Sequence, residues 1–314
     1  MNLPIVSVII PNYNHAAFLE QRITSVLQQS FQDFEVIILD DCSTDNSRDI
    51  IERYRQHPKV SQIIYNTTNS GSVFKQWKKG IEAAAGQYIW LAESDDWCEP
   101  TLLQYLTAGL LQNKQNVLAY CQSYAIDGTN KVFWQTQHGY LEDTIEGRQF
   151  IQQYMVDRNA IVNASMAVWK KELFTGIQQD YLEYKFAGDK VFWINLCRQG
   201  NVFITARVLN YFRSHSGDVS TPAYRSGLNF IEDARILHKL NHETLIPANL
   251  YKKALRKLHR QFWEQRGRFE PAALEAIEQG FYRTPGAVIP AATLKRDARW
   301  KLLRVQLKKV FSKR

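Results

Sequence analysis

The first 112 residues alternate between short apolar runs and segments in which apolar residues recur every three or four positions. The apolar runs are rich in β-branched residues and end at polar ones, which is typical of buried strands. The recurring positions form one face of a helix. The pattern predicts strands over 5–10, 34–39, 60–65 and 88–92 and helices over 18–29, 47–54, 74–85 and 102–112. Strands that alternate with helices favour βαβ units, and therefore a parallel sheet with right-handed crossovers.

The pattern becomes less regular after residue 112 and purely helical after residue 220. It predicts strands over 117–123, 132–134, 165–168 and 202–212, helices over 147–155 and 189–198, and a helix that starts near residue 170. Helical patterns follow over 226–240, 250–265, 271–279 and 293–310, and the sequence contains no internal repeat. We therefore predict an α/β domain over residues 1–220 and a helical C-terminal extension over residues 221–314.

The last predicted helix carries the excess positive charge of the chain. The formal net charge is +8, and residues 295–314 contain nine Lys or Arg against one Asp. Leu303, Leu307, Val310 and Phe311 share one face of this basic amphipathic helix. Such a helix is expected either to lie in a membrane interface, attracted by anionic lipid, or to pack on the protein or a partner subunit. Nucleic acid is not an expected partner, because no nucleic-acid-binding motif accompanies the charge.

The cysteines and the N-terminal segment indicate the compartment. The four cysteines are widely separated, and no pair has the spacing of a zinc site, so we expect reduced thiols. The first residues lack the basic stretch of a signal peptide, and no apolar run approaches the roughly 18 residues that span a bilayer. We expect a cytoplasmic protein, with the inner face of the plasma membrane as a second location if the basic helix binds lipid.

Carboxylates gather where two of the predicted strands end. Asp40 and Asp41 follow the second strand, and Glu93, Asp95 and Asp96 follow the fourth. Ligand sites of open α/β sheets form at the carboxyl ends of strands, and neighbouring carboxylates repel one another unless a cation lies between them. Oxygen ligands favour Mg²⁺ or Mn²⁺, ions that proteins share with substrate phosphates. These positions predict a site for a metal-chelated nucleotide.

Three motifs, in order, resemble those of the family 2 glycosyltransferases: VSVIIPNYN at 6–14, DDCSTD at 40–45 and ESDD at 93–96. The resemblance covers residues 4–220. It implies the GT-A fold, in which a Rossmann-like nucleotide-binding half (1–112) and an acceptor half (113–220) share one mixed sheet. It also implies transfer of a sugar, with inversion, from a nucleotide-diphosphate-sugar donor to a glycan or lipid-linked acceptor. The cofactor would be Mn²⁺ or Mg²⁺, and the product a bacterial cell-surface polysaccharide or glycan.

The resemblance places the loop after the first strand along the nucleotide base and ribose, with contacts from Pro11, Tyr13 and Asn14. Tyr13 is expected to stack on the base; the alternative is a turn with a buried tyrosine. Asp41 matches the acid that accepts a hydrogen bond from a base N–H group. Asp40 is expected either to contact the ligand or to hold the loop by accepting backbone N–H groups, as in an Asx turn.

The third motif implies that Asp95 lies near the ribose and that Asp96 is the principal metal ligand, where the ion stabilises the charge on the leaving diphosphate. Glu93 replaces the usual first Asp, so its contact with the nucleotide sugar is left open. The alternative for this motif is a surface acid cluster that caps a helix. Lys75 or Lys78 is expected to face the phosphates in place of an Arg-Asn pair that many members carry, unless both belong to a solvated basic face.

The acid at the start of the helix over 189–198 matches the catalytic base of the family. Asp189 would take the proton from the attacking hydroxyl while the sugar–phosphate bond breaks on the opposite face. The alternative role for Asp189 is that of a helix N-cap. Glu183 is the nearest rival to Asp189 as the catalytic base. After the last predicted strand, His215 is expected to complete the metal shell, unless its role is structural, and Arg213 to contact phosphate through its planar guanidinium.

Two other functions share this architecture. A sugar-1-phosphate nucleotidylyltransferase would carry a glycine-rich, basic loop after its first strand, and residues 11–14 contain neither glycine nor a cation. A non-catalytic nucleotide-sugar-binding protein would fit the departures from the family pattern at Glu93 and Trp77. Such a decayed enzyme is expected to have lost at least one of Asp96, Asp189 and His215, and all three are present.

Overall fold

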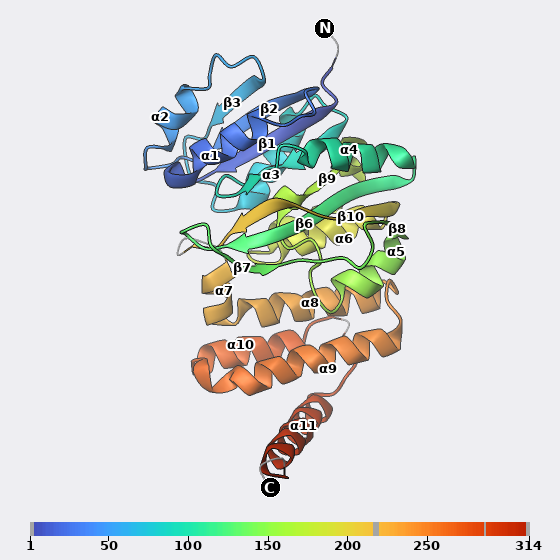
Figure 1. Ribbon diagram of the computed structural model, residues 1–314. Coiled ribbons are helices and arrows are strands. Elements are labelled where there is room, and N and C mark those ends of the chain that lie inside the picture. The colour runs from blue at the N-terminus through green and yellow to red at the C-terminus, as the bar shows by residue number, and fades with distance from the viewer. Residues whose placement is uncertain (1–2, 216–219, 286, 312–314) are drawn as a thin grey trace. The chain divides into compact units, whose positions relative to one another are not determined.

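The computed structural model describes residues 3–215, 220–285 and 287–311, and Figure 1 shows their elements. The chain forms two compact units: Met1–Phe150 with Asn159–His215, and Ile151–Arg158 with the residues after His215. The first unit contains the sheet, and the second contains the C-terminal helices.

The first part of the sheet-containing unit alternates strands and helices as predicted. The strands are β1 (Val6–Asn12), β2 (Phe34–Asp40), β3 (Val60–Tyr65) and β4 (Tyr88–Leu91). The helices are α1 (Ala16–Leu27), α2 (Ser47–Glu52), α3 (Val73–Ala83) and α4 (Leu102–Gln112). Every residue of β1, β2 and β4 is buried, which explains why these strands read as continuous apolar runs.

The second part of this unit is more irregular. Its strands are β5 (Trp97–Cys98), β6 (Asn116–Ile126), β7 (Val132–Gln135), β8 (Glu142–Glu146), β9 (Ala167–Lys170) and β10 (Asn201–Arg213), and its helices are α5 (Gly147–Phe150) and α6 (Gly188–Cys197). The helix predicted near residue 170 is a 3₁₀ helix over Lys171–Gly176. The apolar pattern misses β5 and β8, because β5 has two residues and β8 is polar at all positions but one.

The strands form one mixed sheet in the order β3-β2-β1-β4-β9-β6-β10-β5, with β7 on β6 and β8 on β10. The strands β1 to β4 run parallel to one another, whereas β9 is antiparallel to both β4 and β6. The position of β1 between β2 and β4 means that the chain leaves β1 toward one side of the sheet and later returns on the other. The loops after β1 and β4 therefore diverge at a switch point, which is where open α/β sheets bind ligands.

The second unit is helical, as predicted. It contains α7 (Ser220–Ser226), α8 (Leu228–His242), α9 (Ala248–Gln265), α10 (Pro271–Tyr282) and α11 (Ala291–Phe311). Leu294 and Ala298 of α11 are buried. The apolar face predicted at Leu303, Leu307, Val310 and Phe311 lies outside the described side chains. Within the described ranges, no helix combines the length and the apolarity that a bilayer crossing requires.

Candidate active site

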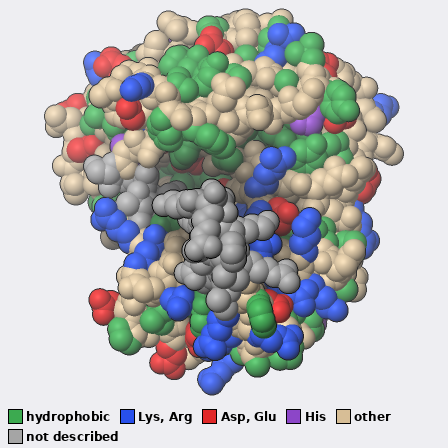
Figure 2. Space-filling view, turned by 60° about the horizontal axis from the view of Figure 1, so that its bottom comes forward, with side chains coloured by type: hydrophobic (Ala, Val, Ile, Leu, Met, Phe, Trp, Pro, Cys, Tyr) green, Lys and Arg blue, Asp and Glu red, His purple; other side chains and the backbone are tan. Residues whose placement is uncertain are grey.

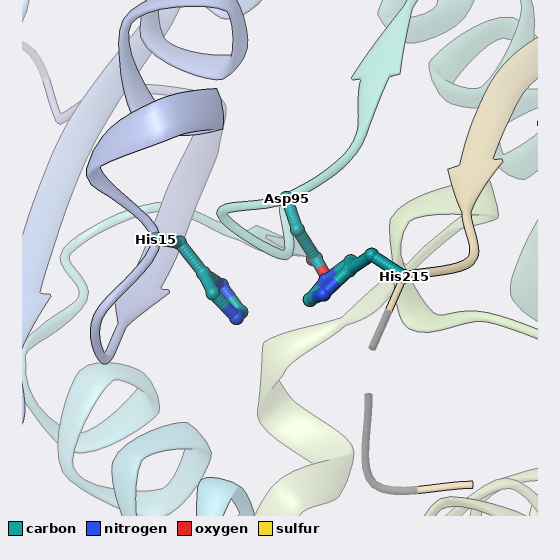
Figure 3. A group of neighbouring side chains, drawn as sticks. All are labelled: His15, Asp95 and His215. Atoms are coloured by element: carbon teal, nitrogen blue, oxygen red, sulfur yellow. The ribbon is translucent and has the colours of Figure 1, made fainter. Parts of the chain in front are cut away.

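Three side chains from distant parts of the chain meet at the carboxyl ends of β1, β4 and β10 (Figure 3). His15 precedes α1, Asp95 follows β4 and His215 follows β10. One ligand atom of each lies within 4.8 Å of the others. Nε2 of His215 is 3.0 Å from a carboxylate oxygen of Asp95. Among the described residues, this group has the composition and spacing to hold a metal ion.

Neighbouring side chains hold the two histidines in place. Nδ1 of His15 is 2.8 Å from the hydroxyl oxygen of Ser94, which leaves Nε2 of that ring for another contact. The ring of Phe18 on α1 packs against His215, with centroids 5.1 Å apart. The rings of His15 and His215 are perpendicular, with centroids 5.3 Å apart. Both imidazoles are therefore positioned by contacts within the sheet-containing unit.

The charges in this group suit metal binding. Burial is the main effect on His15 and lowers the pKa of its imidazole, which favours the neutral ring. Burial alone would raise the pKa of Asp95, but the hydrogen bond from His215 is the first of several effects that outweigh it, so the pKa is lowered. Neutral imidazole and ionised carboxylate are the forms that bind metal ions.

Asp96 lies in a different environment from Asp95. It is 1 % exposed, and both of its carboxylate oxygens accept from protein donors, one from the Ser165 hydroxyl at 2.6 Å and the other from the backbone N–H of Arg213 at 3.0 Å. Burial, followed by the charge of Asp95, raises the pKa of Asp96 to about 7. These contacts hold Asp96 in the interior, and it is Asp95 that lies with the two histidines, so the arrangement favours Asp95 over Asp96 as the metal ligand.

Glu93, which is partly exposed, and the buried Arg22 complete a cluster of charged groups. Glu93 accepts a hydrogen bond from the indole N–H of Trp77 at 2.8 Å. Burial, followed by the charges of Asp95 and Asp96, raises the pKa of Glu93 to about 8. Arg22 on α1 is fully buried. Its Nε donates to the carbonyl oxygen of Glu93 at 2.8 Å, and its Nη2 lies 3.6 Å from Asp96. This cation offsets part of the repulsion among the carboxylates.

Arg213 makes several contacts within the protein, and its predicted phosphate contact stays a prediction. Its guanidinium donates from Nε to the carbonyl oxygen of Asp95 at 2.9 Å, from Nη1 to Asn130 at 2.7 Å and from Nη2 to Gln21 at 2.9 Å. The residue is 2 % exposed, and its guanidinium lies over the ring of Phe18. Three of the five guanidinium N–H groups are therefore bonded within the protein. These bonds fix the turn that carries Asp95.

The two acids after β2 organise the surrounding loops. Asp40 accepts from the side-chain amide of Asn12 at 2.8 Å and from the backbone N–H of Ser43 at 3.0 Å. This is the loop-holding alternative predicted for Asp40. Asp41 accepts from the side chains of Asn66 (2.6 Å), Ser70 (2.7 Å) and Gln76 (3.0 Å) and from the backbone N–H of Ser70 (2.9 Å). Because a carboxylate has about four lone-pair sites, a base contact from Asp41 would have to replace one of these donors.

The loop after β1 presents an aromatic ring to solvent. Pro11 is buried in β1 opposite Leu39 of β2. Asn14 adopts a positive φ of 55°, and its side-chain oxygen accepts from the backbone N–H of Thr44 at 2.7 Å. Between them, Tyr13 is 45 % exposed. The alternative of a buried Tyr13 is therefore excluded, and its ring is accessible for stacking.

The two candidate lysines on α3 both have partners in the protein. Nζ of Lys75 donates to the carbonyl oxygen of Ser70 at 3.1 Å. Nζ of Lys78 donates to the side chain of Gln179 at 2.8 Å and lies 3.8 Å from Glu82. The contacts give no preference for either lysine as the phosphate-facing one.

Asp189 lies in the first turn of α6 and is partly exposed. The side-chain amide of Asn159 donates to its carboxylate at 3.0 Å. The preceding Gly188 packs so closely on α3 that a Cβ atom there would lie 2.4 Å from the ring of Phe74. This contact fixes the start of α6 against α3. The rival acid Glu183 is exposed at the end of a 3₁₀ helix (Gln179–Glu183).

Sequence reasoning did not identify His15, Arg22 or Ser165 as site residues. His15 directly follows the PNYN loop, and a metal-binding residue type at that place was an available signal. Arg22 stands within an apolar helix pattern, where a cation needs a buried partner. Ser165 had no local signal, because its two partners lie about seventy residues earlier in the chain.

Sequence comparisons place the chain among glycosyltransferases. The profile described as "Glycosyl transferase family 2" matches residues 7–174. The GalNAc(5)-diNAcBac-PP-undecaprenol beta-1,3-glucosyltransferase of Campylobacter jejuni is 24% identical over 248 residues, 75% of this chain and 74% of that protein. The poly(ribitol-phosphate) beta-N-acetylglucosaminyltransferase TarS of Staphylococcus aureus is 34% identical over 116 residues, 36% of this chain and 20% of TarS. The Bacillus subtilis glycosyltransferase TuaG is 42% identical over 93 residues, which span 30% of this chain and 36% of TuaG.

Structural similarity extends over most of the chain. The crystal structure of S. aureus TarS 1–349 with UDP-GlcNAc has a TM-score of 0.65 at 20% identity, over 88% of this chain and 81% of that one. The mannosyltransferase PcManGT from Pyrobaculum calidifontis, in complex with GDP-Man and Mn2+, has a TM-score of 0.51 at 17% identity, over 96% of this chain and 81% of that one. The predicted GT-A fold with C-terminal helices is confirmed. Because the family profile matches more than half of its length, the chain belongs to glycosyl transferase family 2.

Proposed function

We propose that the protein is an inverting glycosyltransferase that transfers a sugar from a nucleotide-diphosphate-sugar donor to an acceptor hydroxyl. The reaction would serve the synthesis of a bacterial surface polysaccharide or glycan. The observation that carries the proposal is that His15, Asp95 and His215 lie together at the carboxyl ends of the strands. His15 follows the exposed Tyr13 by two residues in the chain. Family membership and the named activities of TarS and the Campylobacter jejuni relative support the reaction class.

We assign the metal site to His15, Asp95 and His215 in place of Asp96. The three groups offer two imidazoles and one ionised carboxylate at a spacing that suits one ion. Imidazole suits transition metals, and carboxylate suits Mg²⁺ and Mn²⁺, so the mixed set favours Mn²⁺ over Mg²⁺. When bound, the ion would neutralise the charge that develops on the leaving diphosphate.

We assign Asp189 as the catalytic base. Its carboxylate would take the proton from the acceptor hydroxyl as the oxygen attacks the sugar carbon on the face opposite the diphosphate. The hydrogen bond from Asn159 orients the carboxylate. The close packing of Gly188 on Phe74 holds α6 against α3, the helix whose Trp77 bonds Glu93 in the donor site. These contacts would hold the helix that carries the base beside the helix that borders the donor site.

We assign donor binding to residues around the ends of β1, β2 and β4: Pro11, Tyr13, Asn14, Asp40, Asp41, Lys75, Lys78 and Glu93. Tyr13 would stack on the base, because its ring is exposed. Asp40 and Asp41 would shape the pocket through the loops that they hold. Either lysine would reach the diphosphate by exchanging an exposed protein contact for a phosphate.

We further propose that the acceptor half spans residues 113–220 and that the helical extension, residues 221–314, contacts the inner face of the plasma membrane. Residues 221–314 contain 20 Lys or Arg and 8 Asp or Glu. On the face shown in Figure 2, Lys and Arg side chains are frequent in the lower part. Trp300 on α11 is 62% exposed, and such a ring suits the membrane interface. Membrane contact would bring the site to a lipid-linked acceptor.

The donor class is tested by thermal unfolding with nucleoside diphosphates and their sugars, each with and without Mn²⁺. A ligand that binds only the folded protein raises the midpoint of unfolding by mass action. We expect one nucleotide to stabilise the protein, and to do so more strongly with Mn²⁺. The absence of stabilisation by every nucleotide, with metal present, would contradict the proposal.

The catalytic assignment is tested with Asp189→Asn and the matched variant Glu183→Gln. Asp189→Asn should lose turnover and keep nucleotide affinity, because the amide cannot accept the proton. Glu183→Gln should keep both, because Glu183 is exposed. A wild-type protein that binds the nucleotide sugar without turnover, for every acceptor offered, would indicate a binding protein.

A further inference from the structure

Trp77 joins two parts of the proposed active site. It lies in α3 and is 2 % exposed. Its indole N–H donates to Oε1 of Glu93 at 2.8 Å. Glu93 follows β4 and precedes Asp95 by two residues, so this hydrogen bond reaches the edge of the proposed metal site. The indole therefore fixes one oxygen of a carboxylate that borders the donor site.

The other oxygen of Glu93 is available for a ligand. Glu93 is partly exposed, and within the described parts of the chain no group is hydrogen-bonded to its Oε2. The backbone of Glu93 is also fixed, because its N–H donates to the Ser165 hydroxyl at 3.0 Å and its carbonyl accepts from Arg22 at 2.8 Å. With the backbone and Oε1 both held, Oε2 points in one direction.

The same indole contacts the helix that carries the proposed base. The ring of Trp77 packs against Phe192 and Trp193 of α6, with centroid distances of 5.7 Å and 6.1 Å. Phe192 lies one helical turn after Asp189. A side chain that touches both the donor-side carboxylate and the base-bearing helix can set the position of one relative to the other.

We propose that Trp77 is a positioning residue that orients the Glu93 carboxylate so that Oε2 binds a hydroxyl of the nucleotide-sugar donor. The inference rests on the proposed function, since it takes the donor to be a nucleotide sugar. A pre-oriented carboxylate binds a hydroxyl more tightly than a mobile one, because less side-chain freedom is lost on binding. Without the indole N–H, Glu93 would lose both this orientation and a hydrogen-bond donor.

The chain contains a matched control for this hydrogen bond. Trp193 is fully buried in the same aromatic cluster, and its indole N–H has no hydrogen-bond partner among the residues that the structure describes. Trp77→Phe and Trp193→Phe therefore remove similar ring area from one cluster. The first also removes a hydrogen bond to Glu93, and the second does not.

The test measures binding by calorimetry with Mn²⁺ present, using UDP, UDP-GlcNAc, GDP and GDP-mannose as probes. For the probe that wild-type protein binds most tightly, Trp77→Phe should weaken binding on the order of tenfold, which is within the range for the loss of one hydrogen bond. Trp193→Phe should change it by less than about threefold, although both variants lower the melting temperature. Equal losses of affinity in the two variants would overturn the proposal, because packing alone would then explain them.

A double-mutant cycle separates orientation from packing. In a Glu93→Ala background, Trp77→Phe should have no further effect on affinity, because the carboxylate that it positions is gone. Additive losses would contradict the proposal.

If Trp77→Phe does not fold, Glu93→Gln takes its place in the test. The amide of this variant keeps an oxygen that can accept from the indole, so Glu93→Gln should bind the probe more tightly than Glu93→Ala. Equal affinities of the two variants would refute the idea. A wild-type protein that binds none of the probes, or any nucleotide of the wider panel, would instead contradict the proposed function.

Discussion

Replacing the buried Arg22 with Met should destabilise the sheet-containing unit strongly. The guanidinium lies 3.6 Å from Asp96, and both side chains are fully buried. At this distance and at about pH 8, where Asp96 with its pKa of about 7 is mostly ionised, two unit charges in an effective dielectric constant of about 20 attract by about 5 kcal/mol. Breaking a buried ion pair typically costs about 3–5 kcal/mol, because one charge is left without a partner. We therefore expect Arg22→Met to lower the free energy of unfolding by about 4 kcal/mol.

Arg53 provides a matched control for Arg22. Its guanidinium is closer to its partner, at 3.1 Å from Glu20, but the two side chains are 54% and 56% exposed. Exposed ion pairs contribute below about 1 kcal/mol because water and salt screen them. Arg53→Met should therefore have a small effect although its ion pair is the shorter one.

The assay is equilibrium unfolding in urea followed by tryptophan fluorescence. All tryptophans except Trp263 and Trp300 lie in the unit that contains Arg22, so the signal reports mainly on that unit. Burial is the physical quantity that separates the two variants. A loss for Arg22→Met no larger than that for Arg53→Met would refute the reasoning that burial, more than distance, sets the strength of these pairs.

Three further predictions follow from the described contacts. Burial lowers the pKa of His259 to about 4, so the unfolded chain takes up its proton first as the pH falls below about 6.5. The wild-type protein should therefore lose about 2 kcal/mol of unfolding free energy between pH 7 and pH 5 because of His259. Urea unfolding at the two pH values should show this loss for the wild type and not for His259→Gln. Gly188→Ala should reduce turnover more than nucleotide affinity, because its Cβ would meet Phe74 at 2.4 Å. Gly128→Ala should leave both unchanged in the same assays, because no atom of the described residues would lie within 4 Å of its Cβ. Ser165→Ala removes a hydroxyl that donates to Asp96 and accepts from the backbone N–H of Glu93. The variant should lower the unfolding free energy by about 1–3 kcal/mol. A change within about 0.5 kcal/mol would show that water replaces the hydroxyl.

One contact in the structure relates the two departures from the family pattern, at Glu93 and Trp77. The sequence shows Glu93 where an Asp is usual and Trp77 near a position where many members carry an Arg-Asn pair. In the fold, these two side chains are partners in one hydrogen bond. Sequence reasoning treats them as separate irregularities, because they are sixteen positions apart in the chain, with a strand between them.

The sequence by itself determined the order of strands and helices and the edge of the sheet where the acids gather. Apolar periodicity is local, and the carboxyl ends of parallel strands share one edge, so no tertiary information is needed for either result. The sequence did not predict the short β5 or the polar β8, because these strands contain too few apolar residues to form a pattern.

Only the tertiary structure decided which of the acids joins the two histidines of the proposed metal site. Asp95 and Asp96 are neighbours in the chain, yet one joins His15 and His215 while the other is enclosed by Ser165 and the backbone of Arg213. The direction of a side chain in a turn depends on backbone angles that residue type does not specify. The group also needs histidines from opposite ends of the sheet-containing unit, and their meeting is a consequence of strand order, which local sequence does not encode.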